Sequence, residues 1–298
     1  MPASSPRSDL PIAIIGAGPV GLAAAAHLHE YGLPFVILEA GAEPGAAMRQ
    51  WGHVRLFSPW RYNIDKAARG LLEGAGWQAP DPDALPTGGE IVDRYLTPLA
   101  AHMAIRPHLR LNAKVIALDR KGMDKVRSEG RAERPFEIHL ADGSSVDAAA
   151  VIDASGTWTA PNPMGAGGLP VPGEADCTDR IAYGIPDVLG RNRADYAGKR
   201  TLVVGSGHSA FNVLLDLLDL KDAAPETEIV WAVRRDTGNT LFGGGAADAL
   251  PARGDLGVRT RAAVDSGRLT LLRPFSVRAV SRNGDGLDVD GALDGADE

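Results

Sequence analysis

One stretch near the N-terminus, PIAIIGAGPVGLAAAAHLHEYGLPFVILE, constrains the fold more than any other part of the sequence. A short apolar run at 12–15 leads into the glycine motif GAGPVG, then into an alanine-rich segment of helical length, and then into a second apolar run at 35–38. These patterns predict a strand, a turn, a helix and a second strand, in that order. The stretch therefore indicates a βαβ unit, in which a helix packs against two parallel strands.

The glycines of this motif have separate physical roles. Gly16 permits a tight turn, Gly18 lets the backbone approach a pyrophosphate, and Gly21 lets the helix pack closely against the strand. The free N–H groups at the start of the helix favour phosphate, and Glu39, at the end of the second strand, can accept hydrogen bonds from a ribose 2′-OH. The alternative is a glycine turn in an ordinary βαβ unit. The complete context favours a dinucleotide site for an unphosphorylated ribose.

Composition limits the class of protein. The 298 residues, 44% of them hydrophobic, allow one large domain or two ordinary ones with a sizeable core. A net charge of −7 without blocks of Lys and Arg argues against a surface for nucleic acid or for an anionic membrane. Cys177 is the only cysteine, so an internal disulfide, a Cys-x-x-Cys redox pair and a cysteine-rich zinc site are excluded. A reducing, cytoplasmic location fits this usage.

The almost uncharged run 10–28 has about the length of a transmembrane helix or a signal anchor. Its three glycines and Pro19 stand where a nucleotide turn needs them, so a soluble protein without a targeting segment is the better interpretation. The first nine residues, rich in Ser and Pro, are expected to form a loose tail. The histidines show no H-E-x-x-H or comparable ligand spacing, and we expect no metal.

The opening pattern returns in the second half of the chain. A strand at 200–204, the motif GSGHSA, a leucine-rich helix at 211–220 and a strand at 228–233 follow one another. Ala210 replaces the third glycine, a position that requires only a small residue. The predicted phosphate turn consists of Gly205, Ser206, Gly207, His208 and Ser209.

Two arginines follow this second unit where the first has an acid. Arg234 and Arg235 favour a ribose that carries a 2′-phosphate, because guanidinium binds phosphate well. The two units are therefore predicted to bind FAD and NADPH, respectively. A solvated strand end is the alternative for the arginine pair. For His208, simple filling of the turn is as good an interpretation as proton transfer.

The segment 41–59 lacks regular periodicity and carries several aromatic residues. Long irregular segments in compact domains are usually functional, so we interpret it as a wall of the cofactor pocket that includes Gln50 and Trp51. A surface loop pinned by its aromatic side chains is the alternative.

A helix is predicted after Pro86. Thr87 and Glu90 have the spacing of a capping box at its start. Apolar residues then recur at helical spacing and are expected to face the core: Ile91, Tyr95, Leu99 and Met103.

Strands are predicted at 111–118 and 136–140, with an exposed, charged connection between them. The turn Ala-Asp-Gly at 141–143 leads to a third run near Val146, so this group predicts a β-meander. A strand at 149–154 and a proline-rich linker through Pro172 come next. The runs 269–280 and 287–289 predict a second small meander.

Together these elements predict an α/β fold with two Rossmann-like, three-layer dinucleotide-binding domains, each with a small β-meander. The predicted boundaries are 1–165 for the FAD-binding domain and 166–298 for the NADPH-binding domain.

These motifs resemble those of the flavoproteins with two dinucleotide-binding domains, within the pyridine nucleotide-disulfide oxidoreductase superfamily. The flavin-containing (class B) and the plant-type indole-pyruvate monooxygenases are the most similar groups. The resemblance spans roughly 11–298 and rests on GAGPVG followed by Glu39, WGHVRLFSP, PTGGEIVDRYL, VIDASGTWTAP, and GKRTLVVGSGHSA followed by VRR. It implies that Val115 contacts adenine through its backbone. It also implies that Ser155 and Gly156 lie near the cofactor, where the chain passes between domains.

Two departures from these relatives shape the expectation. The segment RIAYGIPDVLGRNRADY stands where the monooxygenases carry F-x-G-x-x-x-H, so Baeyer–Villiger oxygenation is the least expected reaction. Without a cysteine pair, dithiol chemistry of the thioredoxin-reductase type is not expected. The chain ends at GALDGADE, where the family continues toward a flavin-contacting segment. A shortened FAD domain with an open flavin site is therefore expected.

The resemblance implies an FAD-dependent, NADPH-using oxidoreductase. The favoured hypothesis is a monooxygenase that uses O₂ to oxygenate a small organic substrate through a flavin hydroperoxide. The alternatives are an NADPH-dependent flavin reductase that supplies another carrier, and a nucleotide-binding remnant without turnover. Ser58 and Asn63 are candidate polar groups beside the reacting edge of the flavin, with ordinary turn and cap roles as the alternative. A homodimer is the default assembly.

Overall fold

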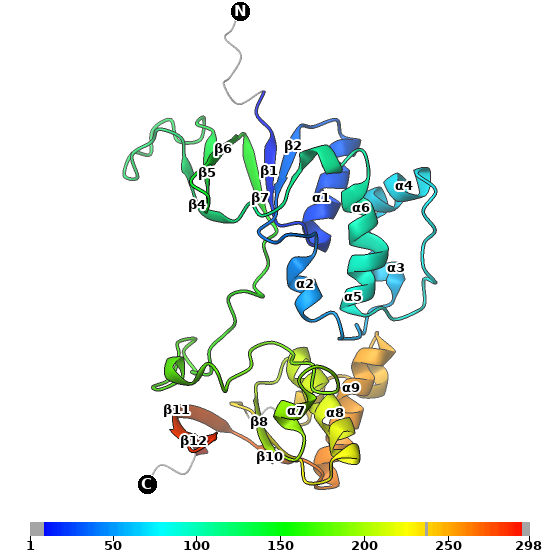
Figure 1. The fold of residues 1–298 in the computed structure, drawn as a ribbon, viewed down its shortest axis with the longest axis vertical. Coiled ribbons are helices and arrows are strands. Elements are labelled where there is room, and N and C mark those ends of the chain that lie inside the picture. The colour runs from blue at the N-terminus through cyan, green and yellow to red at the C-terminus, as the bar shows by residue number, and fades with distance from the viewer. Residues whose placement is uncertain (1–8, 236–237, 294–298) are drawn as a thin grey trace, which may run out of the picture. The chain divides into compact units, whose positions relative to one another are not determined.

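The computed structural model describes residues 9–235 and 238–293, so the loose tail predicted for the first nine residues lies almost entirely outside the described part. The chain divides into two compact units, Met1–Thr159 and Ala160–Glu298 (Figure 1). The division falls a few residues before the predicted boundary at 165 and 166.

The elements follow one another in a regular order. The first unit contains β1 (Ile12–Ile15), α1 (Pro19–Glu30), β2 (Phe35–Leu38), α2 (Ala46–Gln50), α3 (Trp60–Asn63), α4 (Lys66–Gly74), α5 (Gly88–Ile91), α6 (Thr97–Ala101), β3 (Leu109–Arg110), β4 (Val115–Arg120), β5 (Phe136–Leu140), β6 (Ser145–Ala148) and β7 (Ala150–Asp153). The second unit contains α7 (Arg193–Tyr196), β8 (Arg200–Val204), α8 (His208–Ala223), β9 (Glu228–Ala232), α9 (Pro251–Asp265), β10 (Thr270–Leu272), β11 (Phe275–Asn283) and β12 (Gly286–Leu293).

A parallel sheet with the order β3-β2-β1-β7 forms the centre of the first unit. Its side chains alternate between the two faces, as the period of a strand requires. Ile14 and Ile37 pack with the helices, whereas Ala13 and Leu38 pack with the antiparallel meander β4-β5-β6. Figure 1 shows α1, α4 and α6 on one side of this sheet and the meander on the other. The predicted three-layer arrangement is confirmed here.

The helix predicted after Pro86 is present and has its capping box. The Thr87 hydroxyl accepts a hydrogen bond from Glu90 N (3.1 Å), and the Glu90 carboxylate accepts one from Thr87 N (2.7 Å). A π-helical turn, Val92–Leu96, connects α5 to α6. The predicted core positions in this helix are buried, but Met103 is 84% exposed. The prediction for Met103 is wrong because α6 ends at Ala101, before the spacing reaches it.

Two predicted boundaries in the first unit are corrected. The segment 41–59 contains the helix α2, which at five residues is too short to show a period in the sequence. The predicted strand 111–118 begins only at Val115, because Asn112 adopts a positive φ of 55° that turns the chain after β3.

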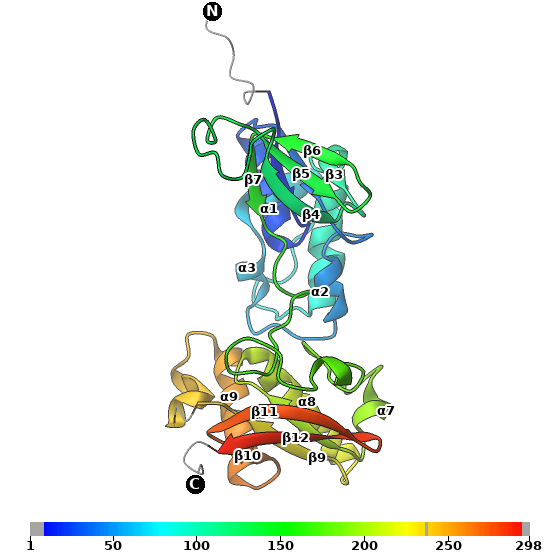
Figure 2. The same ribbon diagram turned by 90° about the vertical axis from the view of Figure 1, so that its left-hand side faces the viewer.

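The second unit is built on a three-stranded parallel sheet with the order β10-β9-β8. The apolar face of α8 packs on this sheet together with α9, a helix that the sequence patterns did not predict. The predicted second meander is corrected. Residues 269–280 divide at Arg273 and Pro274 into β10, which extends the parallel sheet, and β11, which pairs with β12 as an antiparallel ribbon (Figure 2). Pro274 has no N–H with which to continue the sheet.

Asp216 on α8 makes the stability of this unit depend on pH. Burial raises the pKa of Asp216 to about 6, and the carboxylates of Asp219 and Asp187 add to the rise. Because the pKa in the folded state exceeds the unfolded value, the charged form opposes folding above pH 6, and the cost disappears as the pH falls toward 4. Asp216→Asn should therefore raise the free energy of unfolding by about 1–3 kcal/mol at pH 8 and by much less at pH 4.

Denaturant unfolding at both pH values measures this effect. The exposed Asp255 on α9, replaced by Asn, serves as the matched control and should change stability little at either pH. An equal gain for Asp216→Asn at pH 4 and pH 8 would contradict the linkage.

Candidate functional site

The first glycine turn has the geometry that its motif predicts. Gly16 has a φ of +100°, and its N–H donates to Leu38 O (2.8 Å), which links the end of β1 to the end of β2. A Cβ on Gly21 would lie 2.0 Å from Gly16 O, so helix and strand are in direct backbone contact there. A Cβ on Gly18 would meet nothing within 4 Å. Open space therefore lies beside the start of α1, where no side chain caps the helix.

Glu39 lies directly beside this turn, although it is distant from it in sequence. Its side chain is only 9% exposed, and its carboxylate accepts hydrogen bonds from Ala17 N and Gly41 N, both at 2.7 Å. One oxygen thus holds the glycine turn and the other holds the loop after β2. Each carboxylate oxygen has a second lone pair, which can accept a hydrogen bond from a ligand hydroxyl.

The end of β7 completes this edge of the sheet. Ala154 N donates to Ile15 O (2.9 Å), and a Cβ on Gly16 would lie 2.6 Å from Ala154 O. Ser155 then donates from its N–H (3.0 Å) and its hydroxyl (2.7 Å) to Asp153, which lowers the pKa of that carboxyl. Gly156 follows with a φ of 70°. The structure thus brings Gly16, Glu39 and Ser155 together at the carboxyl ends of parallel strands, where ligands bind in open α/β sheets.

A second group gathers around α2. Trp158 donates its indole N–H to Gln50 Oε1 (2.8 Å), and its ring lies 6.3 Å from that of Trp51. A Cβ on Gly88 would lie 2.8 Å from the Trp51 ring, so only glycine fits at the start of α5. Trp158 was not predicted as a site residue, because a contact over 108 positions leaves no local signal in the sequence.

Ser58 and Asn63 contact one another. The Ser58 hydroxyl donates to Asn63 Oδ1 (3.1 Å), and Asn63 Nδ2 donates to Ser58 O (2.8 Å) and Pro59 O (2.9 Å). These bonds close the turn at the start of α3, which is the local role named as the alternative. Their role beside a flavin stays a prediction, as does the adenine contact of Val115, which begins β4 and packs on the core of the meander.

The second glycine turn repeats the geometry of the first. Gly205 has a φ of +118°, and its N–H donates to Ala232 O (3.0 Å). The indole of Trp231 donates to Gly205 O (2.7 Å) from inside the core, a contact that the sequence analysis missed. Gly207 precedes α8, and a Cβ on it would meet nothing within 4 Å. The helix begins at His208, three residues earlier than predicted, so Ser206, His208 and Ser209 are exposed at its start.

Cationic side chains follow β9 at the same edge of its sheet. The strand ends at Ala232, and Arg234 and Arg235 are exposed two and three residues further on. The Arg234 guanidinium donates to Ala166 O, which fixes its position and leaves further N–H groups for a ligand. Both glycine turns thus open a helix at the carboxyl end of a parallel strand, but charges of opposite sign follow them.

The comparisons with known proteins agree with this geometry. The family model described as pyridine nucleotide-disulphide oxidoreductase matches residues 13–225. The chain belongs to this family. Membership of the pyridine nucleotide-disulphide oxidoreductases confirms the resemblance seen in the sequence motifs.

Three relatives define the range of this similarity. Ferredoxin–NADP reductase of Thermus thermophilus is 27% identical over 216 residues, which cover 70% of this chain and 50% of that protein. Indole-3-pyruvate monooxygenase YUCCA8 of Oryza sativa is 28% identical over 225 residues, which cover 71% of this chain and 46% of that protein. The solved bacillithiol disulfide reductase Bdr of Bacillus cereus has a TM-score of 0.65 at 18% identity and covers 95% of this chain and 75% of its own, which shows the shared fold.

The chain spans about half the length of the curated relatives it matches. Among the described residues, no helix combines the length and the apolar character that a bilayer crossing requires.

Proposed function

We propose that this chain is an FAD-dependent, NADPH-using monooxygenase that acts on a small organic substrate with O₂. The observation that carries the proposal is the contrast between its two glycine turns. A buried carboxylate, Glu39, is held against the first turn, and two exposed guanidinium groups, Arg234 and Arg235, follow the second. This contrast suits two adenine dinucleotides that differ at the ribose 2′ position.

The first turn fits FAD. The space beside Gly18 allows a pyrophosphate to approach the uncapped start of α1, whose N–H groups and dipole favour negative charge. The Glu39 carboxylate is fixed where a ribose hydroxyl can donate to it. Gln50, Trp51 and Trp158 form the adjoining polar and aromatic surface for the rest of the cofactor.

The second turn fits NADPH. Space beside Gly207 and the exposed start of α8 suit the pyrophosphate, and the fork of an arginine suits a 2′-phosphate. When bound, NADPH supplies a hydride, and FAD passes the electrons on to O₂. The residues of this chain bind the two cofactors, orient them and limit the access of water.

The oxygenase activity is proposed by analogy with the indole-3-pyruvate monooxygenase relative. A second candidate is an NADPH-dependent flavin reductase that passes electrons to another carrier. The similarity to a ferredoxin–NADP reductase of comparable identity supports it.

Stopped-flow spectroscopy separates the two candidates. The reduced protein, loaded with NADP⁺, is mixed with O₂, and the return of the oxidised flavin absorbance is followed. A monooxygenase holds the reacted oxygen, so the oxidised spectrum should return only after a clear lag. A return without any lag would support the reductase. Colourless protein that binds nucleotide without oxidising NADPH would refute both.

The arginine pair gives a prediction about coenzyme choice. Replacing Arg234 and Arg235 together by Ala removes charge-assisted hydrogen bonds to the 2′-phosphate, each worth about 1.5–3 kcal/mol. The KM for NADPH should rise at least about tenfold, and the KM for NADH should change little. Steady-state kinetics with both coenzymes measure this, with the exposed Arg200→Ala as the control. Equal increases for NADPH and NADH would contradict the assignment.

A further inference from the structure

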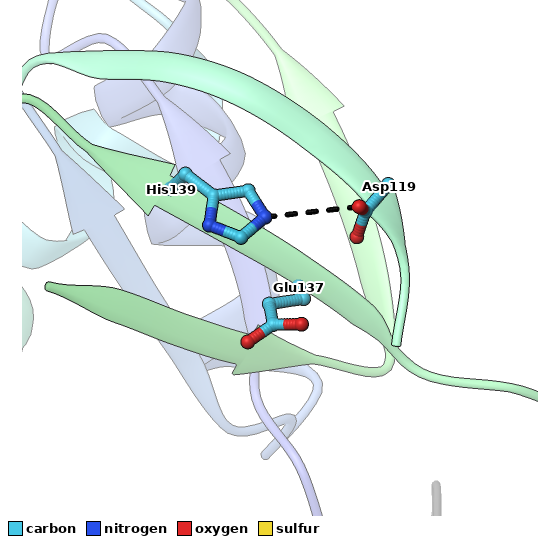
Figure 3. A group of neighbouring side chains, drawn as sticks. All are labelled: Asp119, Glu137 and His139. Atoms are coloured by element: carbon cyan, nitrogen blue, oxygen red, sulfur yellow. Dashed lines mark ion pairs between the residues drawn. The ribbon is translucent and has the colours of Figure 1, made fainter. Parts of the chain in front are cut away.

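The outer face of the β4-β5-β6 meander carries a group of metal-ligating side chains outside the nucleotide sites. Asp119 on β4 lies directly opposite Glu137 on β5, and His139 lies two residues further along β5 on the same face. Their inward neighbours, Ile138 and Leu140, are buried in the core of the meander. Figure 3 shows the three side chains pointing toward one another.

The donor atoms of this group are already close to ligand spacing. One atom from each of Asp119, Glu137 and His139 lies within 4.8 Å of the others. His139 Nε2 is 3.8 Å from Asp119 Oδ2 (Figure 3). Around a tetrahedral Zn²⁺ with bonds of about 2.1 Å, donor atoms stand about 3.4 Å apart. Small rotamer changes are enough to close the remaining difference.

The charges of this face independently favour a cation. Two carboxylates directly opposite one another on neighbouring strands repel and destabilise the pair. The ammonium of Lys121 forms its ion pair with Asp147 on β6, and its attraction to Glu137 is weaker. The Ser145 hydroxyl donates to Glu137 Oε1 (3.3 Å), which orients this carboxylate without neutralising it. A bound divalent ion would offset the repulsion between Asp119 and Glu137.

We propose that Asp119, Glu137 and His139 bind one divalent transition-metal ion of the zinc class. The imidazole nitrogen selects such ions over Mg²⁺ and Ca²⁺, which prefer oxygen ligands. Water completes the coordination, because the site is open to solvent. The ion clamps β4 to β5 beside the connection 121–135, so its role is to stabilise the meander. The expectation of no metal rested on spacing along the chain, which does not show residues that are paired across strands.

Titration calorimetry with ZnCl₂ on the purified, metal-stripped full chain tests this proposal. One equivalent of zinc should bind, and His139→Gln and Asp119→Asn should each weaken the binding at least about tenfold. Thermal unfolding supplies a second readout. Zinc should raise the melting temperature of the wild type, EDTA should reverse the rise, and His139→Gln should abolish it.

The matched control uses another histidine that lies between two carboxylates in the same unit. His27 is 3.0 Å from Asp65 and 3.7 Å from Glu30. His27→Gln should leave the zinc affinity unchanged. No binding of zinc up to about 0.1 mM, or binding that His27→Gln weakens and His139→Gln does not, would overturn the proposal. Equally tight binding of Mg²⁺ would also overturn it, because the imidazole would then have no role.

Discussion

Gly21→Ala should destabilise the first unit severely and leave the protein without flavin. The new methyl group would lie 2.0 Å from Gly16 O and 3.0 Å from Gly16 C. Both are backbone atoms of the turn, so no side chain can move aside to make room. Separating α1 from β1 should cost about 3 kcal/mol, which for a unit of this size lowers the melting temperature by about 10 °C. Thermal unfolding and the visible spectrum of the purified protein measure both effects.

Gly18→Ala is the matched control in the same turn. A Cβ there meets nothing within 4 Å, and the φ of −79° suits alanine, so the unliganded protein should unfold like the wild type. The methyl group would nevertheless occupy the space where a pyrophosphate approaches, and FAD affinity should fall about tenfold or more. A Gly21→Ala protein as stable as the wild type would contradict the packing argument. Unchanged FAD affinity in Gly18→Ala would place the pyrophosphate elsewhere.

Glu39→Gln should weaken both FAD binding and the fold around the glycine turn. The wild-type carboxylate accepts from two buried N–H donors, Ala17 N and Gly41 N. The glutamine amide has only one accepting oxygen, so its NH₂ group must face one of these donors. The unpaired donor should cost about 1–3 kcal/mol of stability, and the lost charge-assisted bond to the ribose should lower FAD affinity about 10- to 100-fold. Denaturant unfolding and flavin titration measure the two effects.

Glu43→Gln is the control for this substitution. Glu43 lies on the same loop, but its side chain is about half exposed and forms only a surface ion pair with Arg49 at 3.3 Å. Its loss should cost less than about 1 kcal/mol and leave FAD affinity unchanged. If both variants lose FAD affinity equally, Glu39 has no special role at the ribose.

Much of the fold could be predicted because its signals are local. The strand, turn, helix and strand of each nucleotide-binding unit occupy a continuous stretch of chain, and backbone sterics together with the period of side-chain burial determine each part. The capping box at Thr87 and Glu90 is equally local and was confirmed. The errors arose where an element ended early or was very short, as at Met103 and α2.

Contacts between distant segments could not be predicted in this way. The pairing of β10 with β9, the indole bond from Trp231 to Gly205 and the bond from Trp158 to Gln50 join residues without any common pattern in the sequence. Which side chains meet there depends on how complete elements pack.

Neighbouring residues alone were enough to predict two nucleotide-binding βαβ units and the opposite charges that follow them, because glycine turns and strand ends are local features. The burial of Glu39 against the first turn, and the shared face of Asp119, Glu137 and His139, became visible only in the folded chain. Strand register sets the second arrangement, and a shift of one residue would move a side chain to the opposite face of the meander.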